Sequence, residues 1–94
     1  MQENIIYRVR GNENILTVSE MLMVPPYKLI ADNNLTEDIY PGQLLVIKRL
    51  NRQLYRVKPF DTVDSICEKF CLSKEDFISF NGKNLVHFNI LVYI

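Results

Sequence analysis

The strongest constraint on this chain is an internal repeat. Residues 7–10 read YRVR and residues 55–58 read YRVK, and a polar turn follows each segment. When the two segments are aligned, apolar residues fall on apolar residues through most of both copies. The mismatches, and a shortening of the second copy by two residues, fall in polar stretches. A repeat of this length indicates that one small structural unit is used twice.

Each copy predicts two strands and two helices in the same order. YRVR and YRVK alternate as strands do, with Tyr and Val on one face and the cations on the other. Apolar residues then recur at helical spacing: Ile15, Val18, Met21 and Leu22 in the first copy, and Val63, Ile66, Cys67 and Phe70 in the second. A second helix follows, and then a closing apolar run at 43–47 or 89–93. The predicted unit is strand, helix, helix, strand, with antiparallel strands.

Residues typical of helix termini bound these helices. Short polar side chains accept hydrogen bonds from the first free amides, and proline suits the first helical position. The expected helix starts are Glu13 or Asn14, Asp61 or Thr62, Pro26, and a capping box of Ser73 with Asp76. Because Asn and Gly tolerate a positive φ, the second helices are expected to end at Asn33 and at Asn81-Gly82.

The predicted fold class is α+β, with two tandem βααβ units. Each unit is expected to have a two-stranded antiparallel sheet with two helices packed on one side. The first unit spans residues 5–47, a short basic linker spans 48–53, and the second unit spans 54–94. Units of this size bury little apolar surface, so we expect the two copies to support each other.

Composition excludes several classes of function. The formal net charge is zero, with both signs interleaved, which argues against a nucleic-acid partner. No apolar run is long enough to cross a bilayer, so no membrane insertion is expected. The sequence also lacks the basic and apolar regions of a signal peptide. A cytoplasmic location is therefore expected for the chain as it stands, or a cell-wall or spore-envelope location if it is part of a larger protein.

The reactive side chains do not form a recognisable catalytic or metal pattern. Cys67 and Cys71 are four residues apart, and with His87 they provide fewer ligands than a zinc site needs. We expect both thiols to be free, with Cys67 buried and Cys71 closing a helix. The sequence has no nucleophile–base pair, phosphate-binding glycine loop or paired active-site carboxylates. The chain is therefore predicted not to be an enzyme and to need no cofactor.

A βααβ unit that begins YxVxxx(D/E) and closes with IYPGQLLVI (39–47) resembles the lysin motif (LysM) family. The second copy carries YRVKPFDTV (55–63), the helix start SKEDF and Asn81. The resemblance implies a non-catalytic module that binds N-acetylglucosamine-containing glycans, such as peptidoglycan or chitin. Binding would occur in a shallow groove between the loop after the first strand and the loop before the last strand.

The resemblance also implies which residues line each groove. In the first copy they would be Asn12, Glu13, Asn14, Ile15, Asn33, Asn34, Leu35, Ile39 and Tyr40. In the second copy they would be Phe60, Asp61, Thr62, Val63, Asn81, Gly82, Lys83, Leu85 and Val86. Amides and hydroxyls there would bond the sugar's polar groups, and apolar side chains would contact its methyl and C–H groups.

The second copy departs from the family pattern at two neighbouring places. Phe60 stands where the family has glycine, and His87-Phe88 replaces the Pro41-Gly42 of the first copy. Because the end of the first strand lies beside the start of the last, Phe60 and Phe88 are expected to lie close together, with Pro59 and His87 alongside. This patch would stack on a sugar or contact a protein partner, the first repeat or a second chain. Alternatively, the two rings only cover each other.

Two functions follow from these observations. The first is a glycan-binding module, most simply for bacterial peptidoglycan, in which two weak sites raise avidity on a repeating polymer. The second is a protein-interaction or assembly module, as in spore-envelope morphogenetic proteins, with altered glycan loops. The first function predicts polar, open loops in both copies, and the first copy meets this better. The absence of a signal peptide, the free cysteines and the altered loops fit the second function.

Overall fold

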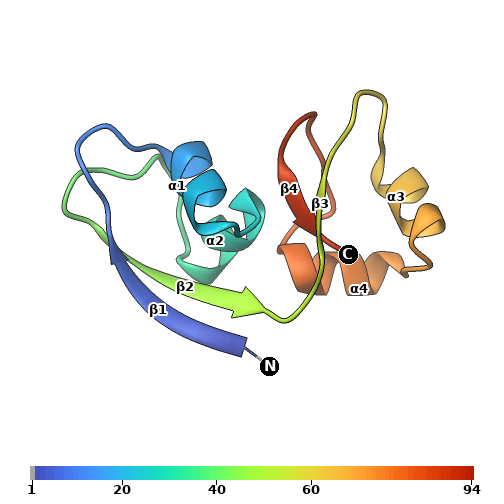
Figure 1. Ribbon diagram of the computed structural model, residues 1–94, viewed down its shortest axis with the longest axis horizontal. Coiled ribbons are helices and arrows are strands. Elements are labelled where there is room, and N and C mark those ends of the chain that lie inside the picture. The colour runs from blue at the N-terminus through green and yellow to red at the C-terminus, as the bar shows by residue number, and fades with distance from the viewer. Residues whose placement is uncertain (1) are drawn as a thin grey trace.

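The computed structural model describes residues 2–94 and contains the predicted unit twice (Figure 1). The first unit consists of β1 (Gln2–Arg8), α1 (Ile15–Leu22), α2 (Pro26–Asp32) and β2 (Leu44–Leu50). The second consists of β3 (Leu54–Arg56), α3 (Val63–Lys69), α4 (Lys74–Asn81) and β4 (Leu91–Tyr93). The fold class, two tandem βααβ units with antiparallel sheets, is confirmed.

The two sheets differ in length although their topology is the same. Strands β1 and β2 pair antiparallel from Gln2↔Leu50 to Arg8↔Leu44, whereas β3 and β4 pair only from Leu54↔Tyr93 to Arg56↔Leu91. The first sheet therefore extends beyond the bounds expected from the repeat. Residues 48–50, assigned to the linker from sequence, continue β2 because the N-terminal end of β1 pairs with them. Only residues 51–53 separate the sheets.

Each unit has its own small core. The alternation in the first strands is confirmed, since Val9 and Val57 are buried while the neighbouring cations are exposed. The first core consists of Val9, Val18, Val24, Leu29, Ile39, Leu45 and Ile47. The second consists of Val57, Ile66, Cys67, Phe77, Ile90, Val92 and Ile94. Both cores combine one sheet face with the inner faces of two helices.

The helices begin where capping side chains are available. Asn14 accepts a hydrogen bond from the amide of Thr17 at 2.9 Å, and Ser73 accepts one from the amide of Asp76 at 3.0 Å. Thr62 forms a reciprocal capping box with Ser65. Pro26 occupies the first turn of α2, as expected. Of the alternatives left open by the sequence, Asn14 and Thr62 are therefore the caps.

Two expectations about the helices are wrong in detail. Met21 was expected to face the core, but it is exposed, and the buried position on that face is Ser19. The Ser19 hydroxyl donates to the carbonyl of Val24 at 2.6 Å, which allows this polar side chain to be buried. The positive φ after α2 falls on Asn34 rather than on Asn33.

Asn33 and Asn81 join helix to strand in an identical way. The Asn33 amide group donates to the carbonyl of Val46 and its Oδ1 accepts from the amide of Val46, at 2.9 and 2.7 Å. Asn81 makes the same pair of bonds with Tyr93, at 3.0 and 2.6 Å. Each side chain therefore extends the hydrogen bonding of the last strand, and Asn81 is 0% exposed.

The two units pack against each other. In Figure 1 the helices of the first unit lie on the side that faces β3 and β4. Tyr27 of α2 packs against the second core, and the amide of Leu50 donates to the hydroxyl of Tyr93 at 3.2 Å. The guanidinium of Arg56 pairs with the carboxylate of Glu20 at 2.8 Å. The expectation that the copies support each other agrees with these contacts.

The two thiols agree with the expectation from the sequence. Cys67 and Cys71 are free, Cys67 is buried, and Cys71 follows α3 with a φ of 57°. Burial raises the pKa of the Cys67 thiol, which disfavours the thiolate. Within residues 2–94, no helix combines the length and apolar character that crossing a membrane requires.

Candidate functional site

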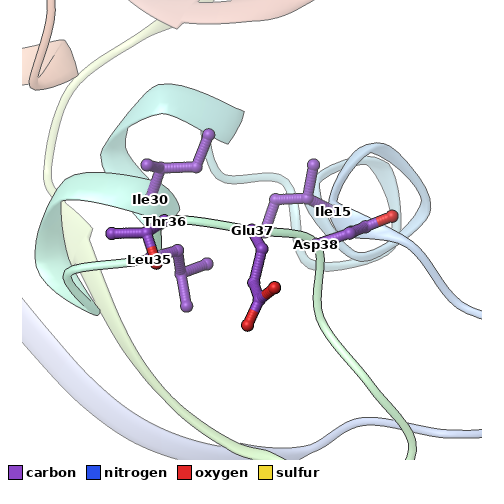
Figure 2. Close-up of a pocket in the computed structure, with 6 residues that line it drawn as sticks. All are labelled: Ile15, Ile30, Leu35, Thr36, Glu37 and Asp38. Atoms are coloured by element: carbon purple, nitrogen blue, oxygen red, sulfur yellow. The ribbon is translucent and has the colours of Figure 1, made fainter.

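The first unit has a hollow that shares Ile15 and Leu35 with the groove predicted for the first copy. Its volume is about 270 Å³, and its lining residues are Ile15, Ile30, Leu35, Thr36, Glu37 and Asp38 (Figure 2). Ile15 comes from the first turn of α1, Ile30 comes from α2, and the others come from the loop that follows α2. We call this hollow the first groove.

The first groove combines an apolar floor with an acidic rim. Ile15, Ile30 and Leu35 provide the floor, and the amide of Leu35 donates to the carbonyl of Ile30 at 3.0 Å, which fixes the start of the loop. The carboxylate of Asp38 accepts a hydrogen bond from the amide of Ile39 at 2.8 Å. Glu37 is exposed, and Figure 2 shows its side chain extending from the loop between Leu35 and Asp38. Such a site offers acceptors beside an apolar surface.

Glu13 and Asp61, both expected in the grooves, hold the loops in which they occur. The hydroxyl of Tyr7 donates to Glu13 at 2.6 Å, and the amide of Arg10 donates to the same carboxylate at 2.8 Å. Tyr55 and the amide of Lys58 bind Asp61 in the same way, at 2.6 and 2.8 Å. The hydrogen bond from tyrosine, together with the backbone amide, lowers the pKa of both carboxyl groups.

Other predicted polar residues also serve the fold. Asn14 and Thr62 cap helices, and both polar atoms of Asn33 and Asn81 bind backbone groups. These side chains therefore already form hydrogen bonds within the protein. Among the predicted polar residues of the first copy, Asn12, Asn14 and Asn34 are exposed.

The remaining predicted residues divide between core and surface. Ile15 and Leu35 line the first groove, whereas Ile39 is buried in the first core and Tyr40 is exposed beyond the groove. In the second copy, Val63 and Val86 pack against the core, and Leu85 is exposed.

Gly82 and Lys83 of the second copy lie against the first unit. A Cβ atom at Gly82 would be 2.8 Å from the Cβ atom of Ala31, and the Lys83 ammonium lies 5.4 Å from the centroid of the Tyr27 ring.

Phe60 and Phe88, the two rings of the expected patch, are both exposed. The strand ends do meet, since the amide of Asn89 donates to the carbonyl of Val57 at 2.8 Å. Phe60, however, is 100% exposed, so no other ring covers it. His87 lies 5.9 Å from the Tyr27 ring, and Phe88 also borders the first unit. The full exposure of Phe60 excludes the alternative in which the two rings cover each other.

Phe60 has an unusual backbone for its residue type. The amide of Asp61 donates to the carbonyl of Lys58 at 3.1 Å, which closes a turn with Pro59 and Phe60 at its centre. The φ of Phe60 is 71°, the value that a type II turn requires at its third position and that glycine supplies best. A bulky side chain at this φ is strained. Phe60 therefore occupies the family's glycine position without losing the turn.

Sequence reasoning missed four residues of the first groove: Ile30, Thr36, Glu37 and Asp38. The signal that could have identified them is the length difference between the copies. The first copy has two more residues between Asn33 and Ile39 than the second has between Asn81 and Leu85. This longer loop supplies the rim of the groove. In the part of the chain that the structure describes, no group of three metal-binding side chains occurs.

Comparison with solved structures finds similarity to two spore cortex-lytic enzymes. The SleL enzyme of Bacillus cereus is 21% identical over 98% of this chain and 23% of that chain, with a TM-score of 0.46. The SleL enzyme of Bacillus megaterium QM B1551 is 23% identical over 95% of this chain and 22% of that chain, with a TM-score of 0.48. This chain thus spans less than a quarter of either enzyme.

Comparison with protein families identifies the repeated unit. No curated protein matches the chain. The model of the LysM domain matches residues 7–48 and 55–91, which correspond to the first and second βααβ units. LysM domains are binding modules, in general for N-acetylglucosamine-containing glycans, and they are not catalytic. Because both matches together cover most of the sequence, this chain belongs to the LysM family, as a tandem pair of LysM domains.

Proposed function

We propose that this chain is a non-catalytic module that binds N-acetylglucosamine-containing glycans, with bacterial peptidoglycan as the polymer. The observation that carries the proposal is the first groove, in which an apolar floor of Ile15, Ile30 and Leu35 lies beside the carboxylates of Glu37 and Asp38. A protein that binds this polymer would be located where the polymer is, in the cell wall or the spore envelope.

The chemistry of the first groove suits an N-acetylated sugar. The acetyl methyl group and the C–H face of the ring would contact Ile15 and Leu35. Hydroxyl groups would donate to the Glu37 carboxylate and to free acceptor positions on Asp38. Since Glu13 and Asn14 are held by internal hydrogen bonds, their role is to fix the shape of the opposite loop.

The two units would contribute unequally. The loop that forms the acidic rim in the first unit is two residues shorter in the second. Gly82 and Lys83 of that shorter loop are engaged with α2 of the first unit. We therefore assign the principal site to the first unit.

An amide NMR titration with β-1,4-linked N-acetylglucosamine oligomers tests this assignment. Shifts are expected first at Ile15 and at residues 34–38. Thr36→Arg would place a long side chain over the groove and is expected to weaken binding at least tenfold, because it blocks the apolar floor. Met21→Arg is the control, since Met21 is exposed on another face of α1. Equal binding by the two variants would exclude the first groove as the site.

The choice of polymer is tested by co-sedimentation with insoluble peptidoglycan and with chitin. The proposal expects the chain to sediment with peptidoglycan, and Thr36→Arg to remain in solution. Sedimentation with chitin but not with peptidoglycan would support binding to N-acetylglucosamine-containing glycans and overturn the assignment to peptidoglycan.

A protein-interaction function has one observation in its favour. Phe60 is fully exposed although its backbone is strained, which is unusual unless the ring contacts something outside the chain. This function predicts no shifts with any oligomer and a complex that Phe60→Gly dissolves. Amide shifts at the first groove on addition of a glycan would favour glycan binding over the protein-interaction function.

A further inference from the structure

A second hollow lies between the two units, and we propose that it is an additional saccharide subsite which joins the two LysM domains into one glycan-binding surface. This inference rests on the proposed function. The hollow has a volume of about 330 Å³ and is bordered by α1, by the start of α2, by β3 and by the segment before β4. We call it the junction cleft. Neither unit contains it alone.

The polar part of the junction cleft is an ion pair between the units. Both nitrogens Nη1 and Nη2 of Arg56 donate to the Glu20 carboxylate at 2.8 Å, and Nη1 also donates to the carbonyl of Asn89 at 3.0 Å. Each partner remains nearly half exposed. The Glu20 oxygens therefore keep lone pairs that can accept from hydroxyl and amide groups, and the Arg56 Nε–H has no partner among the described residues.

The apolar part of the cleft is formed by two exposed side chains. Phe88 is 65% exposed and lies on one wall, and Leu16 lies on the opposite wall. An aromatic ring offers a flat surface for the C–H face of a sugar. The combination of a ring, an acceptor pair and a donor is suited to a ligand with both apolar and hydroxyl faces.

The charge of the cleft selects against other ligands. Glu20 and Arg56 neutralise each other, and the hydrogen bond between them lowers the pKa of Glu20 and raises that of Arg56. A phosphate, a nucleic acid or an acidic peptide would need an excess of cations. A neutral N-acetylated saccharide needs no excess of cations. Its hydroxyl groups can form hydrogen bonds with the ion pair.

The position of the cleft connects it with both predicted grooves. Ile15 lines the first groove and the next residue, Leu16, lines the junction cleft, so the first turn of α1 separates the two hollows. On the other side, Phe88 lies in the same segment between α4 and β4 as Leu85 and Val86 of the predicted second groove. A glycan longer than one groove can therefore continue across the turn into the cleft.

The test compares short and long oligomers of β-1,4-linked N-acetylglucosamine on the full chain by calorimetry and amide NMR. A disaccharide is expected to shift only the amide signals of the first groove. A hexasaccharide is expected to shift the amides of Leu16, Glu20 and Asn89 as well, and to bind about tenfold more tightly.

Phe88→Ala is expected to remove most of this gain, a loss of about five- to tenfold for the hexasaccharide, without changing the affinity for the disaccharide. Ile6→Ala is the matched control, because Ile6 is 63% exposed on the outer face of β1. Glu20→Gln keeps the shape of the side chain and is expected to give a smaller loss in the same direction. The amide spectra of the variants confirm that they are folded.

The outcomes separate this inference from the proposed function. Shifts at residues 34–38 with no response at Leu16, Glu20 and Asn89 to the hexasaccharide would leave the glycan module intact and overturn the junction subsite. Equal affinities of Phe88→Ala and Ile6→Ala for the hexasaccharide would do the same. No response to any oligomer would overturn both proposals, and binding of a protein at Phe88 instead would replace the saccharide as occupant.

Discussion

At the scale of single residues, the repeat preserves interactions rather than residue types. Tyr7 with Glu13 and Tyr55 with Asp61 hold their loops through the same short hydrogen bond, although one copy uses glutamate and the other aspartate. The carboxylate also binds a backbone amide three residues earlier in each case. The loop after the first strand of each unit is therefore held in shape by the same internal hydrogen bonds.

These carboxylates predict the direction of the acid response. Folding lowers the pKa values of Glu13 and Asp61, so their contribution to stability is complete above the ordinary carboxyl pKa of about 4 and is lost as the pH falls through the lower, folded values. The double variant Glu13→Gln and Asp61→Asn is expected to be less stable at neutral pH and to have a flatter stability profile below about pH 4. Urea unfolding at several pH values measures this. An unchanged acid profile would contradict the loop role.

Phe60 predicts a gain in stability on substitution. Its φ of 71° costs a non-glycine residue about 1 kcal/mol or more, and its exposed ring makes no compensating contact. Phe60→Gly is expected to raise the free energy of unfolding by up to about 1 kcal/mol, reduced by the greater flexibility of glycine in the unfolded chain. Chemical denaturation of both proteins is the measurement. A loss of stability would show that the ring supports the fold.

At the scale of elements, the repeat register identifies the buried face of α1. Met21 aligns with Lys69 of α3, which is exposed, whereas Ser19 aligns with Cys67, which is buried. Both Ser19 and Cys67 donate to a carbonyl in the following turn. The alignment of the two copies therefore places Ser19, and not Met21, on the buried face of α1.

This register predicts opposite effects for two neighbouring lysine substitutions. Met21→Lys adds a charge on the exposed side of α1 and is expected to change stability by less than about 0.5 kcal/mol. Val18→Lys puts an unpaired charge into a core position that is 0% exposed and is expected to unfold the first unit. Circular dichroism melting of the two variants distinguishes them. A stable Val18→Lys protein would refute the assigned face.

At the scale of the whole molecule, Gly82 decides how closely the units approach. A Cβ atom there would lie 2.8 Å from the Cβ of Ala31 and 3.0 Å from the carbonyl oxygen of Tyr27. Gly82 also has a φ of 81°, which glycine adopts without strain. The junction cleft and the contact of Tyr27 with the second core depend on this approach.

Gly82→Ala is expected to separate the units, with Gly42→Ala as the matched control. Both glycines have a positive φ, 81° and 86°, so the backbone cost is similar, but a Cβ at Gly42 meets nothing within 4 Å. Only Gly82→Ala should therefore change the amide shifts of Ala31, Glu20 and Leu50 and reduce the affinity for long oligomers. The same response from both variants would mean that the clash at Ala31 has no effect.

The sequence by itself determined the repeat, the order of elements, the inward faces of the strands and most helix starts, because these depend on local periodicity and on capping chemistry. It also indicated the two loops of the first groove. The tertiary structure decided that Asn33 is not free for a ligand, since both polar groups of its side chain bind Val46, a residue 13 positions away that only the fold brings near.

The tertiary structure alone also decided the direction of the aromatic side chains and the packing of the units. Phe60 and Phe88 start from one edge, but the turn at Phe60 projects its ring outward, whereas Phe88 borders α1. The approach of Gly82 to Ala31 and the pairing of Glu20 with Arg56 join residues of different copies. A repeat pattern describes each unit separately and carries no information about such contacts, because they depend on how the two surfaces fit.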